Sequence, residues 1–145
     1  MDAKVFYASK TGNTKKVAEA IAGALGSRAQ RITGSESGVE AAVLFLGAAV
    51  YATEDHGPLP EVLEFLGRLD PASVKEAAVF TTGFKEGDAC GKLRGLLERR
   101  GLRVRKESFF CPGRFFLFFN FGRPNAEDLK GAMEFANASR GGKGR

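Results

Sequence analysis

Three short apolar runs, each followed by a helix-like pattern, most constrain what this 145-residue chain can fold into. The runs lie within Lys4–Ser9, Ala41–Val50 and Ala77–Thr82, and none of them alternates apolar with polar residues. A strand without such alternation is buried on both faces, which is typical of parallel sheets whose connecting helices cover both sides. The pattern therefore predicts an α/β protein with helices on both faces of a parallel sheet.

The remaining elements complete an alternating order of strands and helices. Residues 28–33 and 102–106 are predicted as shorter strands, and no helix is expected between the second and third strands. In the last strand, Leu102 and Val104 are expected to face inward and Arg103 and Arg105 outward, as in an edge strand. Helices are predicted over residues 14–26, 59–69, 88–100 and 124–138. Their expected core faces consist of Val17, Ile21 and Leu25; Leu59, Val62, Leu63 and Leu66; Leu93, Leu96 and Leu97; and Leu129, Ala132, Met133 and Ala136.

The length of the chain favours one domain with one core. Residues 1–139 are predicted to form that domain, and residues 140–145 a flexible tail. No apolar run approaches the roughly 20 residues of a membrane span, and the first residues do not resemble a signal peptide. We therefore expect a cytoplasmic monomer without membrane contact. Cys90 and Cys111 are expected to be buried, reduced thiols, and they lack metal-ligand spacing with His56, which is the single histidine.

The net charge of +5 is distributed unevenly. Residues 89–106 hold seven basic residues and one acidic residue, and residues 140–145 hold three basic residues and no acidic one. A solvated helix face next to a charged edge strand explains this distribution, and a docking surface for an acidic protein partner is the alternative. No interleaving of aromatic and basic residues accompanies the charge, which disfavours nucleic-acid binding.

A small polar loop follows the first strand. Ser9-Lys10-Thr11-Gly12-Asn13-Thr14 places three hydroxyls and a glycine before the start of a helix. The N–H groups and partial positive charge of a helix N-terminus favour a phosphate, and Gly12 lets the backbone approach it. The loop lacks the pattern of nucleotide P-loops and dinucleotide sites, so one terminal phosphate fits better than a triphosphate. Simple capping of the helix by a Ser or Thr hydroxyl is the alternative.

The loop resembles the phosphate loop of flavodoxins, Ser/Thr-x-Ser/Thr-Gly-Asn-Ser/Thr. The resemblance extends to residues 47–57, to residues 82–88 and to the C-terminal stretch Gly122–Ala136, and so covers nearly the whole chain. It implies a three-layer αβα sandwich whose five-stranded parallel sheet has the order 2-1-3-4-5. It also implies FMN as a noncovalent cofactor.

The resemblance assigns residues of three loops to FMN. Five of them match the positions that hold the phosphate and one matches a variable position: Ser9, Thr11, Gly12, Asn13 and Thr14, with Lys10 as the variable one. A second group matches the segment along the isoalloxazine ring: Ala48, Ala49, Val50, Tyr51 and Ala52. A third group matches the opposite side of the ring: Thr82, Gly83 and Phe84. Tyr51 and Phe84 are the aromatic side chains expected against the ring, and core packing is the alternative for both.

Three features depart from the flavodoxin pattern. Ala52 stands where many flavodoxins have a glycine whose peptide turns toward flavin N5, and a Cβ makes that positive φ costly. We therefore expect weaker stabilisation of the one-electron-reduced flavin. The chain is basic, whereas flavodoxins are commonly acidic. Residues 115–121 hold five phenylalanines, which form part of the core, a lid or a partner surface.

The function that the resemblance implies is electron transfer between redox partner proteins, with FMN supplying the redox chemistry. No side chain is implied as a catalytic acid or base, and no histidine and acid accompany Ser9 as a hydrolase triad would require. Two alternatives remain open. One is an FMN-dependent NAD(P)H or quinone reductase with a pocket walled by residues 115–121. The other is a flavin-free interaction module.

Overall fold

The computed structural model describes residues 2–8, 12–49, 60–83, 89–112 and 124–139, and its elements alternate as predicted. The strands are β1 (Ala3–Ala8), β2 (Ala29–Arg31), β3 (Ala41–Ala49), β4 (Val74–Gly83) and β5 (Val104–Pro112). The helices are α1 (Asn13–Leu25), α2 (Pro60–Gly67), α3 (Ala89–Arg99) and α4 (Ala126–Ser139). The predicted tail, residues 140–145, lies outside the described residues.

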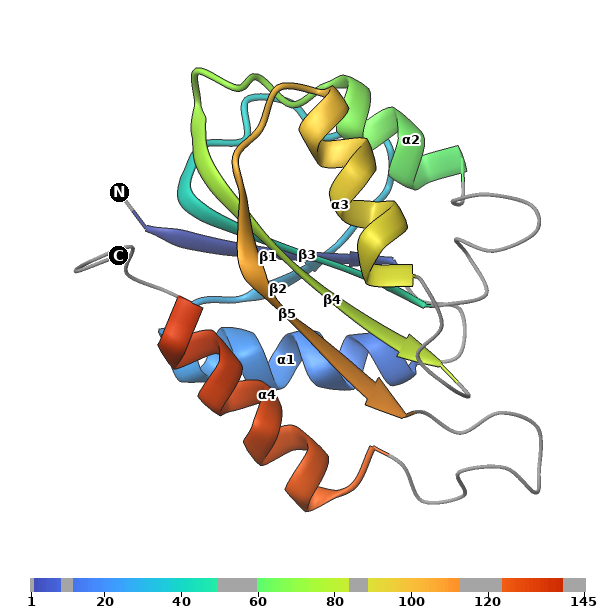
Figure 1. The fold of residues 1–145 in the computed structure, drawn as a ribbon, viewed down its shortest axis with the longest axis vertical. Coiled ribbons are helices and arrows are strands. Elements are labelled where there is room, and N and C mark those ends of the chain that lie inside the picture. Colours follow the sequence, from blue (N-terminus) through green and yellow to red (C-terminus); the bar gives the residue numbers. More distant parts are fainter. Residues whose placement is uncertain (1, 9–11, 50–59, 84–88, 113–123, 140–145) are drawn as a thin grey trace.

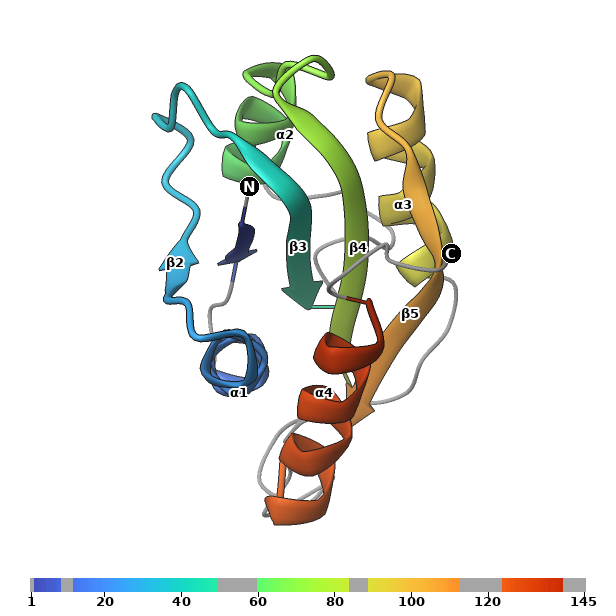
Figure 2. The same ribbon diagram turned by 90° about the vertical axis from the view of Figure 1, so that its left-hand side faces the viewer.

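The five strands form one parallel sheet in the order β2-β1-β3-β4-β5. Helices α1 and α4 cover one face of this sheet, and α2 and α3 cover the other (Figure 1). The turned view in Figure 2 separates the two helical layers on either side of the strands. The three-layer αβα sandwich and the strand order are therefore confirmed.

The uninterrupted apolar strands supply two cores because successive side chains point to opposite faces of the sheet. Val5, Tyr7, Phe45 and Phe80 pack toward α1 and α4. The α2 and α3 side receives a second set: Phe6, Leu44, Leu46 and Val79. A polar residue at any of these positions would enter one core or the other, which explains why the strands lack alternation.

The predicted core faces of α2 and α4 are each wrong at one position. Leu63 and Met133 were placed inside, but they are 47% and 43% exposed. Phe65 and Phe135 are buried instead, where their rings pack against Phe6 at 4.9 Å and against Phe45 at 5.8 Å between centroids. Each aromatic ring covers more of the sheet than the aliphatic side chain two positions before it, so the helix turns that face inward.

The edge strand β5 differs most from its prediction. It begins at Val104 and continues to Pro112, beyond the predicted 102–106, and β4 begins at Val74 rather than Ala77. Arg105, predicted to face outward, is buried, and its Nη1 donates to Glu76 Oε1 at 2.7 Å. The carboxylate on the neighbouring strand compensates the buried charge, which apolar and polar alternation alone does not reveal.

The connection from β2 to β3 contains no helix, as predicted. Glu36 stabilises a turn at the start of this connection, because its carboxylate accepts hydrogen bonds from the N–H groups of Thr33 at 2.6 Å and Gly34 at 2.9 Å. Partial burial raises the pKa of the Glu36 carboxyl, but the hydrogen bonds outweigh this effect and hold the pKa below its usual value. The carboxylate therefore stabilises the turn over residues 33–36.

Most of the basic residues in the stretch 89–106 are exposed, which both interpretations of this stretch require. Lys92, Arg99, Arg103 and Lys106 are exposed. Arg100 also has a structural role, because its Nη2 donates to Gly67 O at 2.8 Å and its Nε to Leu69 O at 3.2 Å. Cys90 and Cys111 are buried, and neither forms a disulfide, as expected. No helix within the described ranges is both long enough and apolar enough to cross a membrane.

Candidate functional site

The carboxyl ends of the strands bring three of the predicted segments to one edge of the sheet. Ala8 at the end of β1 pairs with Ala48 of β3, and Ala49 at the end of β3 pairs with Thr82 of β4. Gly83 ends β4 in the next strand along the sheet. Because all strands are parallel, the segments that follow them leave from the same edge. The described residues at these strand ends, Ala8, Ala48, Ala49, Thr82 and Gly83, are all small.

Helix α1 begins at the same edge, directly after β1. Its N-cap is Gly12, whose φ of 91° is a left-handed conformation that a residue with a Cβ rarely adopts. A Cβ at Gly12 would meet no atom of the described residues within 4 Å, so the left-handed conformation is the reason that this position favours glycine. The first turn of α1 contains no acidic residue, so its positive end is not neutralised from within the helix. This end is suited to an anion.

A buried pair of hydroxyls connects α1 to the end of β4. Thr14 Oγ1 and Thr82 Oγ1 lie 2.7 Å apart, and both side chains are about 1% exposed. The bond joins residues 68 positions apart, one from the predicted phosphate loop and one from the predicted ring loop. The Thr14 hydroxyl therefore bonds across the sheet edge, in contrast to a hydroxyl that only caps its own helix.

Replacing Thr82 with valine will destabilise the protein by about 1–3 kcal/mol, because the buried Thr14 hydroxyl loses its partner. Urea unfolding of the purified protein, with no ligand added, measures this loss. The double variant Thr14→Val/Thr82→Val leaves no unpaired hydroxyl, so it is expected to be more stable than the sum of the single changes predicts. Strictly additive effects would contradict a bond between the two side chains.

Thr81, the residue before Thr82, points to the opposite face of the sheet and makes a second connection. Its Oγ1 lies 3.2 Å from Cys90 Sγ at the start of α3, and both side chains are buried. Adjacent threonines thus tie the end of β4 to helices on both faces. Sequence reasoning missed this role of Thr81, although two threonines at the end of an otherwise apolar strand are a visible signal.

The structure describes seven of the predicted site residues and brings them to this one edge: Gly12, Asn13, Thr14, Ala48, Ala49, Thr82 and Gly83. The other predicted site residues lie outside the described residues: Ser9, Lys10, Thr11, Val50, Tyr51, Ala52 and Phe84. His56 and the phenylalanine run over residues 115–121 also lie outside them. Within the ranges that the structure covers, no cluster of His, Cys, Asp and Glu side chains is arranged to hold a metal ion.

No protein-family model and no curated protein matches the sequence. Solved structures match nearly the whole chain. A flavodoxin from the domain Archaea has a TM-score of 0.69 at 22% identity, with 94% of both chains covered. Flavodoxin 2 from Bacillus cereus has a TM-score of 0.69 at 22% identity, with 95% of this chain and 97% of that chain covered.

The chain has the flavodoxin-like fold. The same fold forms part of a larger protein, the rubredoxin oxygen:oxidoreductase of Desulfovibrio gigas. That match has a TM-score of 0.68 at 17% identity and covers 93% of this chain but 34% of that one. In the flavodoxin-like order, β1 is followed by α1 on one face and β3 by α2 on the other (Figure 2). The order of strands therefore reverses between β1 and β3, which is where open α/β sheets bind ligands.

Proposed function

We propose that this flavodoxin-like protein binds FMN noncovalently and carries electrons between redox partner proteins. The main observation in support of this proposal is the Thr14–Thr82 hydroxyl pair at the edge where β1, β3 and β4 end. It brings a residue of the phosphate-loop motif against a residue of the predicted ring loop. Two of the solved structures with this fold are flavodoxins. In the flavodoxin strand order, FMN lies at the point where the order reverses, between the first and third strands.

The phosphate would be held by the start of α1. Gly12 and the first-turn N–H groups of the helix would face the anion, and the hydroxyls of Ser9, Thr11 and Thr14 would donate to it. If Thr82 donates its proton to Thr14, the Thr14 hydroxyl retains its own proton for the phosphate. Bound FMN supplies the redox chemistry, while the protein positions the cofactor and excludes water from it.

The ring would lie between the segments that follow β3 and β4. Ala48, Ala49, Val50, Tyr51 and Ala52 are proposed on one side, and Thr82, Gly83 and Phe84 on the other. The ring edge left open between these segments is the proposed contact for redox partner proteins, which we propose to be acidic because the chain has a net charge of +5. We propose that the protein acts as a cytoplasmic monomer.

The proposal is tested by adding FMN to the purified apoprotein. We expect stoichiometric binding with a perturbed flavin spectrum and quenched flavin fluorescence, together with slow oxidation of NAD(P)H unless a separate reductase is added. Absence of FMN binding would contradict the proposal and favour the alternative of a flavin-free interaction module. Rapid steady-state oxidation of NAD(P)H by the protein alone, with a quinone as acceptor, would identify an FMN-dependent reductase.

The position of the basic residues limits how far they affect the flavin potential. Five of the seven basic residues in the stretch 89–106 lie at the end of α3 or the start of β5, away from the candidate site: Arg99, Arg100, Arg103, Arg105 and Lys106. Lys92 lies in the first turn of α3, next to the site edge, and is exposed. Charges several Debye lengths from the flavin contribute little at physiological salt.

Replacing Lys92 with glutamine will therefore make the two-electron potential of bound FMN more negative, on the order of 10 mV at low ionic strength, because a nearby cation favours the anionic reduced flavin. Arg103→Gln removes the same charge at the far end of the sheet and is expected to leave the potential unchanged. Spectroscopic redox titrations at low and high salt compare the two variants. Equal shifts in both would mean that only the net charge matters.

A further inference from the structure

The outer strand β5 gives the sheet one long edge. In the part of the chain that the structure describes, β5 is the last strand of the order β2-β1-β3-β4-β5 and has nine residues. The other outer strand, β2, has only three residues and offers little backbone for pairing. A long outer strand presents N–H and C=O groups to which a strand of another molecule can bond. Of the two edges, β5 is therefore the one that needs protection.

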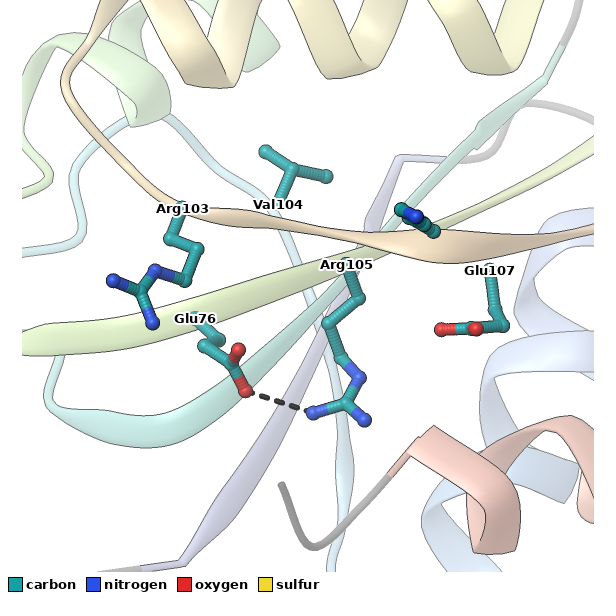
Figure 3. Close-up of a pocket in the computed structure, with 6 residues that line it drawn as sticks. Glu76, Arg103, Val104, Arg105 and Glu107 are labelled. Atoms are coloured by element: carbon teal, nitrogen blue, oxygen red, sulfur yellow. Dashed lines mark hydrogen bonds and ion pairs between the residues drawn. The ribbon is translucent and has the colours of Figure 1, made fainter. Parts of the chain in front are cut away.

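The carbonyl of Val104 faces this outer edge. The N–H of Ala77 in β4 donates to Arg103 O at 2.8 Å, so the carbonyl of the next residue along the chain points away from β4. Figure 3 shows the matching alternation of the side chains: Val104 extends toward α3, whereas Arg105 and Glu107 extend toward the opposite face. Val104 O is thus an acceptor that the sheet itself does not use.

One arginine of α3 covers two acceptors of this edge. Arg94 Nη2 donates to Lys106 O at 2.8 Å, and Nη1 of the same guanidinium donates to Val104 O at 3.5 Å. Arg94 is half-buried, so its side chain lies against the strand. A guanidinium presents several donors in a rigid, planar arrangement, which allows one side chain to hold two carbonyls of the same strand.

The same side chain holds an irregular stretch of β5. Ala77 of β4 pairs with Val104, but Val79 pairs with Ser108, so one residue of β4 faces three residues of β5. Lys106, whose carbonyl accepts the shorter of the two bonds from α3, lies within this bulge. Bulges on outer strands disfavour pairing with another chain because they interrupt the regular row of donors and acceptors. The guanidinium therefore occupies the acceptors and also fixes the bulge.

These bonds have a role that solvent could not fill. Carbonyls at an outer edge can accept hydrogen bonds from water, so the fold does not need Arg94 to satisfy them. Water does not exclude a competing strand, whereas a fixed side chain does. The competing strand that fits best is β5 of a second copy of this chain, because a two-fold arrangement satisfies both outer edges at once. We propose that Arg94 keeps the protein monomeric by blocking the pairing of β5 with β5 of a second copy.

The test is analytical ultracentrifugation of the purified Arg94→Gln variant over a range of protein concentrations, with no flavin added. We expect this variant to dimerise at concentrations about tenfold or more below those that the wild-type protein requires, because a two-fold dimer gains each freed hydrogen bond twice. Arg94→Lys keeps the charge but loses the paired donors, so it is expected to dimerise as well. Lys92→Gln is the matched control. It removes the same charge from an exposed position of the same helix and is expected to remain as monomeric as the wild type.

Hydrogen exchange of the backbone amides shows where the copies meet. In Arg94→Gln, amides of residues 104–111 are expected to exchange more slowly as the protein concentration rises, while β2 is unaffected. Unchanged slow exchange in β1 and β3 shows that each variant keeps its fold. The proposal is overturned if both Arg94 variants stay as monomeric as the wild type, if Lys92→Gln dimerises equally, or if the slowed amides lie outside β5. Since no flavin is present, the outcome does not depend on whether the protein binds FMN.

Discussion

A Gly47→Ala variant will be less stable than the wild-type protein by about 1–3 kcal/mol, and Gly47→Val by more. Gly47 of β3 pairs with Phe80 of β4, and a Cβ at Gly47 would overlap the Phe80 ring at Cε2. Phe80 is fully buried, so its ring has no free volume to move into. The free energy of unfolding in urea measures the effect directly.

Two further variants separate steric overlap from a general intolerance of substitution. Gly95 lies inside α3, where a Cβ would meet nothing within 4 Å, so Gly95→Ala is expected to stabilise the protein by up to about 1 kcal/mol. Shortening the ring with Phe80→Leu in the Gly47→Ala background is expected to restore part of the lost stability, although Phe80→Leu alone destabilises. A double variant no better than the sum of the single changes would contradict an overlap between these two residues.

A Thr11→Ala variant will bind FMN about tenfold more weakly or worse, while its affinity for riboflavin will change little. The proposed bond from the Thr11 hydroxyl to the phosphate is charge-assisted, and such bonds contribute about 1.5–3 kcal/mol. Riboflavin lacks the phosphate and cannot lose this bond. Fluorescence titrations of the apoprotein with both ligands measure the difference.

Lys10→Gln is the control for this measurement, because Lys10 occupies the variable position of the motif and is expected to matter less. An equal loss of affinity for FMN and riboflavin in Thr11→Ala would mean that the loop is perturbed as a whole. That result would defeat the phosphate assignment without excluding flavin binding. An unchanged FMN affinity would place the phosphate elsewhere.

The fold was predictable from the sequence because the buried strands carry a strong signal. Residues 41–49 and 77–80 are apolar throughout, and only a sheet covered on both faces buries such strands fully. The prediction was weaker where several apolar residues compete for one helix face. In α2 and α4 the sequence offers Leu63 beside Phe65 and Met133 beside Phe135, and packing against Phe6 and Phe45 decides between them.

The candidate site was predictable as a location but not as a set of contacts. The polar loop before α1 and the parallel strand order together indicate which edge of the sheet holds the site. The bond between Thr14 and Thr82 depends on how α1 lies against β4, and no local pattern encodes a contact across 68 residues. The burial of Arg105 was unpredictable for the same reason. An arginine in an alternating strand is predicted to be exposed, because the sequence pattern does not reveal its partner Glu76, 29 positions away.

The packing of α1 along α4 has a consequence for how the chain folds during synthesis. The two helices lie side by side over one face of the sheet (Figure 1). That face carries Val5, Tyr7, Phe45 and Phe80, which come from three strands made well before α4. Until residues 126–139 leave the ribosome, α1 alone shields these side chains from the solvent. The nascent protein is therefore most open to chaperones and to association with other chains just before its last helix emerges.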